Sequence, residues 1–222
     1  LYTASALKLK EALAGGAWSG NGKLEVLSQL MRLRQICCDP ALCFEDYTGE
    51  SAKLETCVSL IASASAAGHK ILLFSQFASM LERIRERLLQ EGISSHLLVG
   101  ATPKEERSRM VQTFASDEVP VFLISLKAGG TGLNLTAADI VIHYDPWWNV
   151  AAQNQATDRA YRIGQEKPVT VYKLILKDTI EENLLKLQNA KLALAAQVVS
   201  EGMVSLGDLS QNELMELFEQ NP

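Results

Sequence analysis

The stretch PVFLISLKAGGTGLNLTAADIVIHYDPWWN (residues 120–149) holds two short apolar runs separated by a glycine-rich segment. The runs are PVFLISL (120–126) and DIVIHY (139–144). Near-continuous apolar runs of this length are typical of strands buried on both faces of a parallel sheet. The stretch therefore predicts two such strands, each followed by a loop with glycine, polar or aromatic residues.

Further apolar runs lie on both sides of this stretch, at KILLFS (70–75), SHLLVG (95–100) and VTVYKLIL (169–176). Amphipathic segments separate them, among them ASMLERIRERLLQEG (78–92) and TPKEERSRMVQTFAS (102–116). Strands that alternate with helices indicate an α/β fold, in which a parallel sheet is covered on both faces. We predict a RecA-like or Rossmann-like sheet flanked by helices.

Helical patterns also precede and follow the predicted sheet. Residues 1–38 contain two helical patterns split by GGAWSGNG (15–22), and the second ends at CCDPAL (37–42). A long helix is expected over 179–197, and SQNELMELFEQ (210–220) begins with a plausible serine cap. The sheet is thus expected to carry helical extensions at both ends.

The composition is that of an ordinary globular protein. The 222 residues are 47% hydrophobic and 21% charged, which allows one or two domains. The net charge of −5 gives no strong overall basic field, so any DNA contact must be local. No apolar run approaches the ~20 residues of a membrane span, so we expect no membrane partner. Because the chain starts at Leu1 and no signal peptide precedes it, we expect a piece of a longer protein.

The four cysteines show neither metal-type nor disulfide-type spacing. Cys37, Cys38, Cys43 and Cys57 form no CxxC pair and have no neighbouring histidine partner. Reduced thiols in an intracellular protein are therefore favoured over a zinc site or a disulfide framework, and no metal ligand is predicted. The three histidines, His69, His96 and His143, are scattered and are interpreted as structural.

Unusual polar segments follow the predicted strands. Ser75-Gln76 comes after the first strand, SLKAGGTGLNL (125–135) after the third, and DPWWN (145–149) after the fourth. Ligands of open α/β sheets bind beyond the carboxyl ends of the strands. This edge of the sheet is therefore the expected functional edge.

The glycine-rich loop KAGGTGLN (127–134) has three glycines in four positions. Glycines permit close approach of the backbone to a ligand, and successive N–H groups can hold a phosphate. Lys127 and Thr131 can also reach phosphate oxygens. The paired Trp147 and Trp148 leave two interpretations open: at least one packs under the sheet edge, or one faces a partner domain or a nucleic-acid backbone.

The segment QNQATDRAYRIGQ (153–165) has no proline or glycine before Gly164, which predicts a helix that ends there. On such a helix one face is entirely polar, and its members are Gln155, Asp158, Arg159 and Arg162. The opposite face carries Ala152, Ala156 and Ala160, which would let the helix lie close to a sheet. Asp158 and Arg162 could form a solvated ion pair. A phosphate-facing role is favoured because the helix follows the functional edge.

The chain contains no GxxxxGK[ST] loop and no acidic pair in a DExx-type position at a strand end. These are the parts that hold the phosphates and Mg²⁺ in motor ATPases. A RecA-like domain with arginines but without these parts is expected to be the second half of a two-domain motor.

These residues resemble a known family over nearly the whole chain. LRQICCDPAL, ILLFSQFASML, LISLKAGGTGLNLTAADIVIHYDPWWN, QATDRAYRIGQ and TIEENLLKLQNAK resemble successive conserved segments of one domain. That domain is the C-terminal RecA-like (helicase C) lobe of Swi/Snf-type ATPases, in helicase superfamily two. Compact spacing between the second and third segments indicates a bacterial or archaeal enzyme. The chain departs from the family where it has Tyr161, Cys38-Asp39 and Asn149-Val150.

The resemblance implies three regions and one activity. The regions are a helical extension over 1–50, a RecA-like lobe over 51–177 and C-terminal brace helices over 178–222. The activity is translocation on double-stranded DNA driven by ATP hydrolysis. It implies that Arg159 and Arg162 are arginine fingers that meet the phosphates of a nucleotide bound on another lobe.

The resemblance also implies binding residues. The nucleotide-binding residues would be Gly132, Asn134, Gln155 and Asp158. The DNA-binding residues would be Ser75, Gln76, Lys127, Gly129, Gly130, Thr131 and Trp148.

The implied cofactors are ATP and Mg²⁺, bound mainly by an N-terminal RecA-like lobe of the same protein. That lobe and double-stranded DNA are the expected partners, with a nucleoprotein or polymerase as a further target. The location would be the nucleoid in a prokaryote or the nucleus in a eukaryote. The chain alone should not hydrolyse ATP. Two alternatives stay open: a catalytically inactive lobe that acts as an interaction scaffold, and a stand-alone enzyme for nucleotides or sugar phosphates.

Overall fold

The computed structural model describes residues 1–15, 21–126, 128, 133–162 and 164–195. The chain divides into two compact units, each described by itself below. The first comprises residues 1–49, 148–150 and 175–222, and the second comprises residues 50–147 and 151–174.

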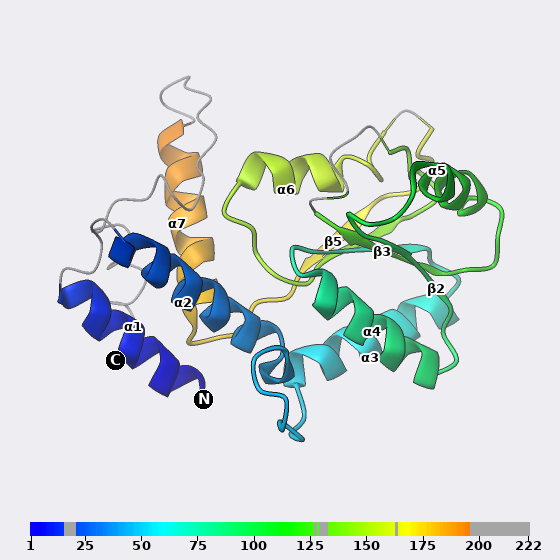
Figure 1. Ribbon diagram of the computed structural model, residues 1–222. Helices are drawn as coiled ribbons and strands as arrows, with labels where there is room; N and C mark the ends of the chain where they lie inside the picture. Colours follow the sequence, from blue (N-terminus) through cyan, green and yellow to red (C-terminus); the bar gives the residue numbers. More distant parts are fainter. Residues whose placement is uncertain (16–20, 127, 129–132, 163, 196–222) are drawn as a thin grey trace. The chain divides into compact units, whose positions relative to one another are not determined.

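The second unit is built around a sheet of five parallel strands, which confirms the predicted α/β class (Figure 1). The strands are β1 (Ile71–Ser75), β2 (Ser95–Leu98), β3 (Val121–Ser125), β4 (Ile140–His143) and β5 (Thr170–Lys173). Their order across the sheet is β2-β3-β1-β4-β5. All five predicted strands are therefore present, and β1, the first in the chain, lies at the centre of the sheet.

Helices cover both faces of this sheet (Figure 1). They are α3 (Ala52–Ala66), α4 (Ala78–Gln90), α5 (Lys104–Thr113) and α6 (Val150–Thr157). Helices α3 and α4 pack on one face against β1, and α4 also contacts β2 and β3. The other face carries a continuous apolar cluster that joins β1, β3 and β4 to α5 and α6.

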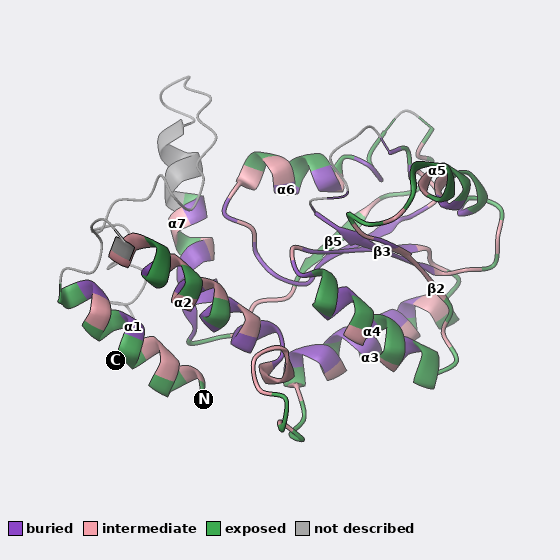
Figure 2. Cartoon of the chain, in the orientation of Figure 1, coloured by how far each residue is buried: buried purple, intermediate pink, exposed green. Residues whose placement is uncertain are grey.

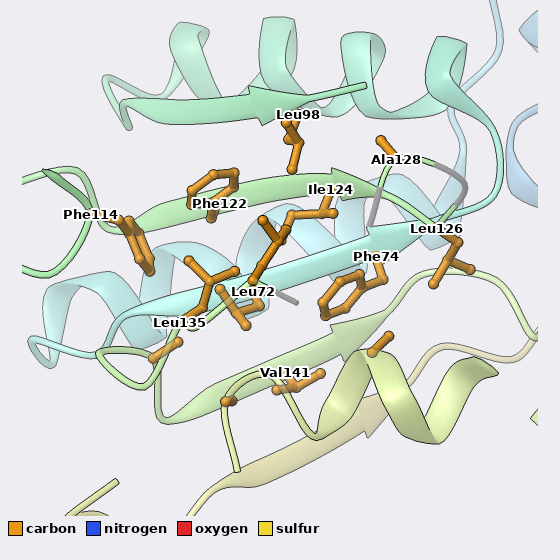
Figure 3. Packing of buried hydrophobic residues seen from close by; sticks show 14 of the residues in the cluster. Leu72, Phe74, Leu98, Phe114, Phe122, Ile124, Leu126, Ala128, Leu135 and Val141 are labelled. Carbon is orange, nitrogen blue, oxygen red and sulfur yellow. The ribbon is translucent and has the colours of Figure 1, made fainter. Parts of the chain in front are cut away.

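The cluster on the second face explains why the inner strands are apolar along their whole length. Leu72 and Phe74 of β1, Phe122 and Ile124 of β3, and Val141 of β4 project into it (Figure 3). The alternate residues of β1 and β3 are equally buried toward α3 and α4. Strands buried on both faces cannot show a polar–apolar alternation, which is the pattern seen in the sequence.

Strand β5 is different, because all four of its residues are exposed. It lies at the edge of the sheet and pairs with β4 alone among the described strands. The burial colours of Figure 2 show the contrast with the buried inner strands. An edge strand with exposed Val171 and Tyr172 is held to the sheet mainly by its backbone hydrogen bonds.

The first unit is helical in its described part. Its elements are α1 (Tyr2–Ala14), α2 (Asn21–Cys38), the short 3₁₀ helix η1 (Pro40–Leu42) and α7 (Ile180–Ala195). Leu9, Leu13, Leu30 and Leu33 are fully buried there. The two predicted N-terminal helices and the long helix after Asp178-Thr179 are confirmed. The helix expected over 210–220 lies outside the described residues.

Lys70, just before β1, fastens the turn that follows α5. Its ammonium donates to the carbonyls of Phe114, Asp117 and Val119 at 2.5, 2.8 and 3.2 Å, and lies 3.2 Å from the Asp117 carboxylate. His96 of β2 contacts the same carboxylate at 2.6 Å. Burial alone would raise the pKa of Asp117, but hydrogen bonds from His96 and Lys70 hold that pKa below its usual value.

We expect Lys70→Met to lower the free energy of unfolding by about 2 kcal/mol, because a charged donor to several carbonyls is lost while those carbonyls stay half-buried. Urea denaturation of the chain measures this. Lys104→Met is the matched control, since Lys104 is exposed at the start of α5. Equal midpoints for the two variants would contradict the structural role of Lys70.

Candidate functional site

The carboxyl ends of β1 and β4 are joined through Asp145, which follows β4. The Asp145 carboxylate is 1% exposed and accepts hydrogen bonds from Ser75 Oγ and Gln76 Nε2, both at 2.5 Å. The backbone N–H of Gln76 also points to it, at 3.3 Å. This carboxylate fixes the start of the loop after β1. Asp145 belongs to the segment DPWWN, but its role as an acceptor was not predicted from the sequence.

This arrangement alters the expectation for two predicted DNA-binding residues. Ser75 is 0% exposed and its hydroxyl is engaged by Asp145, so it does not lie on a surface that a DNA strand could touch. Gln76 is half-buried and directed to the same carboxylate. In this structure Ser75 supports the loop from inside, and Gln76 is the only one of the pair with exposed surface.

The glycine-rich loop after β3 is described only at its two ends. Lys127, Gly129, Gly130, Thr131 and Gly132, predicted as phosphate-contacting residues, lie outside the described residues. Of the ends, Leu126, Ala128, Leu133 and Leu135 are buried in the apolar cluster, and Asn134 is exposed. Arg107 of α5 donates to the carbonyl oxygen of Ala128 at 2.8 Å. The loop is thus fastened at both ends, and Arg107 is a support that the sequence did not reveal.

The helix predicted to run to Gly164 is wrong in its second half, because α6 ends at Thr157. The chain then turns, and the carbonyl of Arg159 accepts a hydrogen bond from Leu135 N at 3.1 Å. The side-chain amide of Gln165 donates to the carbonyls of Thr136, Ala138 and Ala160. These bonds to a distant loop replace the continuation of the helix.

As a consequence, the predicted polar face of four residues does not exist as a row. Gln155, Asp158 and Arg162 are exposed, but Arg159 is only 4% exposed. The described residues include no ion pair between Asp158 and Arg162. The predicted burial of the alanine face is confirmed for Ala156 and Ala160, which lie in the same apolar cluster as Phe74.

Arg159 lies in a cavity of about 70 Å³ on the α6 side of the sheet. The cavity is lined by Phe74, Leu126, Trp147, Ala152, Gln155, Ala156 and Arg159. The Nε and Nη1 atoms of Arg159 are buried and have no hydrogen-bond partner among the residues that the structure describes. Burial, and then the charge of Arg162, lower the pKa of this guanidinium from its usual value. A buried cation with unused donors is costly and is suited to receive an anion.

Arg162 lies three residues further along, on the surface. It borders an open depression of about 490 Å³ together with Tyr161, Gln165, Glu166, Lys167 and Pro168. Its side chain makes no hydrogen bond or ion pair with the described residues. Two cations therefore follow the end of α6: Arg159 is buried and Arg162 is exposed.

The two tryptophans separate into different environments. Trp147 packs against the apolar cluster and lines the Arg159 cavity, and its backbone N–H donates to Gln153 Oε1 at 3.1 Å. Trp148 is 8% exposed, and the guanidinium of Arg34 lies 5.3 Å from the centre of its ring. The packing interpretation is the one that the structure favours, and little of Trp148 is open to a DNA strand.

The described residues contain no group of three or more histidine, cysteine or acidic side chains arranged to hold a metal ion. Within the same residues, no helix has both the length and the apolar character needed to span a bilayer.

Comparison with known families gives one match by sequence profile. The family described as "Helicase conserved C-terminal domain" matches residues 52–164. This range runs from α3 through the strands to the turn after Arg162, so it includes both arginines and the whole sheet except β5.

Several curated proteins are similar to most of the chain. It is 44% identical over 205 residues to a protein of Bacillus subtilis named "Putative ATP-dependent helicase/translocase YwqA". That alignment covers 88% of this chain and 22% of the relative. A zebrafish (Danio rerio) protein, "Chromodomain-helicase-DNA-binding protein 1-like", is 39% identical over 201 residues, with 86% and 20% covered. The chain thus spans about a fifth of the length of the curated relatives that it matches.

Two solved structures extend the likeness to three dimensions. "Sulfolobus solfataricus SWI2/SNF2 ATPase C-terminal domain" superposes with a TM-score of 0.77 at 31% identity, covering 100% of this chain and 92% of that one. "Sulfolobus solfataricus SWI2/SNF2 ATPase core in complex with dsDNA" gives a TM-score of 0.79 at 33% identity, covering 98% of this chain and 46% of the other. The fold and the arginine-bearing segment are therefore both within the matched region.

Proposed function

Since the chain belongs to the helicase conserved C-terminal domain family and is the C-terminal RecA-like lobe of a Swi/Snf-type helicase, we propose that it is the second motor lobe of an ATP-dependent translocase on double-stranded DNA. In this role Arg159 and Arg162 act on a nucleotide held by another lobe. The observation that carries the proposal is the pair of cations at the end of α6, one buried with unused donors and one exposed.

The chemistry supports this assignment. Transfer of a γ-phosphoryl group develops negative charge on oxygens that a cation can stabilise, and an arginine finger supplies roughly 10³–10⁵ in rate. The sequence has no phosphate-binding GxxxxGK[ST] loop to hold ATP and Mg²⁺. The arginines would therefore meet the nucleotide only when an N-terminal lobe of the same protein closes on this one. The chain alone would be an incomplete motor.

For DNA, the proposal uses the loops at the carboxyl ends of β1 and β3. Gln76 keeps exposed surface there, and Lys127, Gly129, Gly130 and Thr131 would add backbone N–H groups and side chains for a phosphate backbone. Gly132, Asn134, Gln155 and Asp158 would lie on the nucleotide side. One solved relative is titled as a complex with double-stranded DNA, which is the reason for proposing a duplex. Ser75, whose hydroxyl donates to Asp145, would support these contacts from within the protein.

The test is steady-state ATP hydrolysis by the full-length protein, alone and with duplexes of increasing length. We expect strong stimulation by duplex that grows with length to a plateau, as for a motor that moves along DNA, together with displacement of a bound third strand. Single-stranded DNA is the control and should stimulate less. Absence of duplex stimulation would leave an inactive scaffold lobe as the better description. Hydrolysis by the 222-residue chain alone would contradict the incomplete-motor proposal.

A further inference from the structure

His143, the last residue of β4, is buried in the core next to the end of α6. It is 1% exposed, and its Nε2 lies 2.9 Å from Oγ1 of Thr157, the last residue of α6. Its ring stacks on Phe74 with 5.6 Å between centroids and 23° between planes. A single side chain therefore touches the end of the helix before Arg159 and one wall of the Arg159 cavity.

The direction of the His143–Thr157 hydrogen bond follows from the inventory of hydrogens. The Thr157 hydroxyl has one hydrogen, and it is donated to the Gln153 carbonyl at 3.3 Å. Thr157 Oγ1 must then accept from His143, so the imidazole carries its proton on Nε2. Within the described part of the chain the buried Nδ1 atom has no partner, which is acceptable for an unprotonated nitrogen. Burial, and then the charge of Lys173, lower the pKa of His143 to about 4, so the ring is neutral at ordinary pH.

Arg159 depends on this region for its position because its side chain has few directional contacts. Nε and Nη1 make no hydrogen bond with the described residues, so within that part of the chain packing and the backbone do most to fix the guanidinium. Two backbone hydrogen bonds hold this residue. The Arg159 N–H donates to the Ala156 carbonyl at 3.3 Å, and the Leu135 N–H donates to the Arg159 carbonyl. The bond from Ala160 N to Thr157 O, 3.1 Å, closes the turn. The contacts at Ala156 and Thr157 start from the end of α6, whose last residue is Thr157.

We propose that His143 is a positioning residue for Arg159: with its ring held against Phe74, it donates from Nε2 to Thr157, which fixes the last residue of α6 and thereby the place of the Arg159 guanidinium. This inference rests on the proposed function, since it concerns how accurately Arg159 is presented to a phosphate. Small displacements of a catalytic group lower the reaction rate strongly, so a residue that fixes the position of Arg159 would affect turnover.

The experiment compares two amide substitutions in the full-length protein. His143→Gln places an amide N–H near the original Nε2 position, whereas His143→Asn places it near Nδ1, out of reach of Thr157. Both bury one neutral amide but differ by one methylene group, so their difference is assigned to the hydrogen bond when Thr157→Val gives the same loss as His143→Asn. Thr157→Val removes the same bond from the other side with little change of shape. Turnover (kcat) and KM for ATP are measured at saturating duplex, with the melting temperature of each variant.

We expect His143→Asn and Thr157→Val each to lower kcat on the order of tenfold or more, with KM nearly unchanged, because the loss is in the placement of the transition-state contact. His143→Gln should retain most of kcat. The double variant His143→Asn/Thr157→Val should be no slower than the slower single variant, since both substitutions remove one bond.

The outcomes separate this inference from the function on which it rests. Arg159→Ala is measured beside the other variants, and unchanged turnover there overturns the proposed function itself. Turnover that is lost in Arg159→Ala but kept in His143→Asn and Thr157→Val overturns the positioning role alone. Equal losses in His143→Gln and His143→Asn also overturn it, because they would show that a donor near the original Nε2 position does not restore the placement of Arg159.

Discussion

Replacing Arg162 by alanine in the full-length protein is expected to lower the maximal rate of ATP hydrolysis roughly 10³-fold or more. That loss equals about 4 kcal/mol or more of transition-state stabilisation. The structural reason is that Arg162 is exposed beside an open depression and has no hydrogen bond or ion pair with the described residues of its own chain. Nothing within that part of the chain competes with a phosphate for its guanidinium.

The measurement is duplex-stimulated turnover together with the affinity for a non-hydrolysable ATP analogue. Affinity should change much less than turnover, because ATP would be held mainly by the other lobe. Arg85→Ala is a suitable control, since Arg85 is an exposed arginine on α4. Arg162→Lys should recover only part of the rate, because an ammonium lacks the planar fork of donors. Turnover in Arg162→Ala equal to that of Arg85→Ala would refute the finger assignment.

Replacing Asp145 by alanine is expected to lower the free energy of unfolding by about 2–4 kcal/mol. The carboxylate is buried and accepts from the hydroxyl of Ser75 and from both the side chain and the backbone of Gln76. Alanine would take this acceptor from the buried Ser75 hydroxyl, and an unsatisfied buried donor costs more than a hydrogen bond contributes.

Urea denaturation of the chain measures the effect, with Ser75→Ala and Asp145→Asn for comparison. Ser75→Ala removes one donor and leaves the carboxylate its other partners, so its cost should be smaller. Asp145→Asn keeps one acceptor oxygen and should fall between the two. A cost for Asp145→Ala no greater than that for Ser75→Ala would show that the loop after β1 does not depend on this carboxylate.

The sheet could be predicted from the sequence because its signal is local. Each strand is a short apolar run bounded by turn residues, and burial on both faces makes the run continuous. The helices α4, α5 and α7 were equally accessible, since apolar periodicity and capping residues such as Thr179 are visible within a few positions. The order of the strands was not predicted, because pairing joins residues far apart in the chain.

The end of α6 could not be predicted for a different reason. No residue between Thr157 and Gly164 is a strong helix breaker, so local propensity favours continuation. What ends the helix is a set of hydrogen bonds to the loop before β4, from Leu135 N to Arg159 O and from Gln165 to Thr136 and Ala138. Burial of Arg159 follows from that turn, and periodicity on an assumed helix gave the opposite orientation.

The supports of the site were missed because their partners are also distant in sequence. Asp145 and Ser75 are 70 residues apart, and His143 reaches Thr157 only because β4 and α6 pack together. Residue type was a partial signal: a carboxylate directly after a buried strand is unlike its apolar neighbours and requires partners. The same argument applied to a histidine within an apolar run would have singled out His143.

The central place of β1 has a consequence for the order of events during synthesis. Its two neighbours in the sheet, β3 and β4, come later in the chain, and β4 ends at His143. At about 5–20 residues per second, a ribosome needs several seconds to make the segment between them. The apolar segment ILLFS has both backbone edges unpaired until β3 is made, and one edge unpaired until β4 follows. The nascent chain would therefore bind chaperones until β4 has left the exit tunnel. Substitutions that slow the pairing of β1 with β4 would lower the yield of folded protein before they lower its activity.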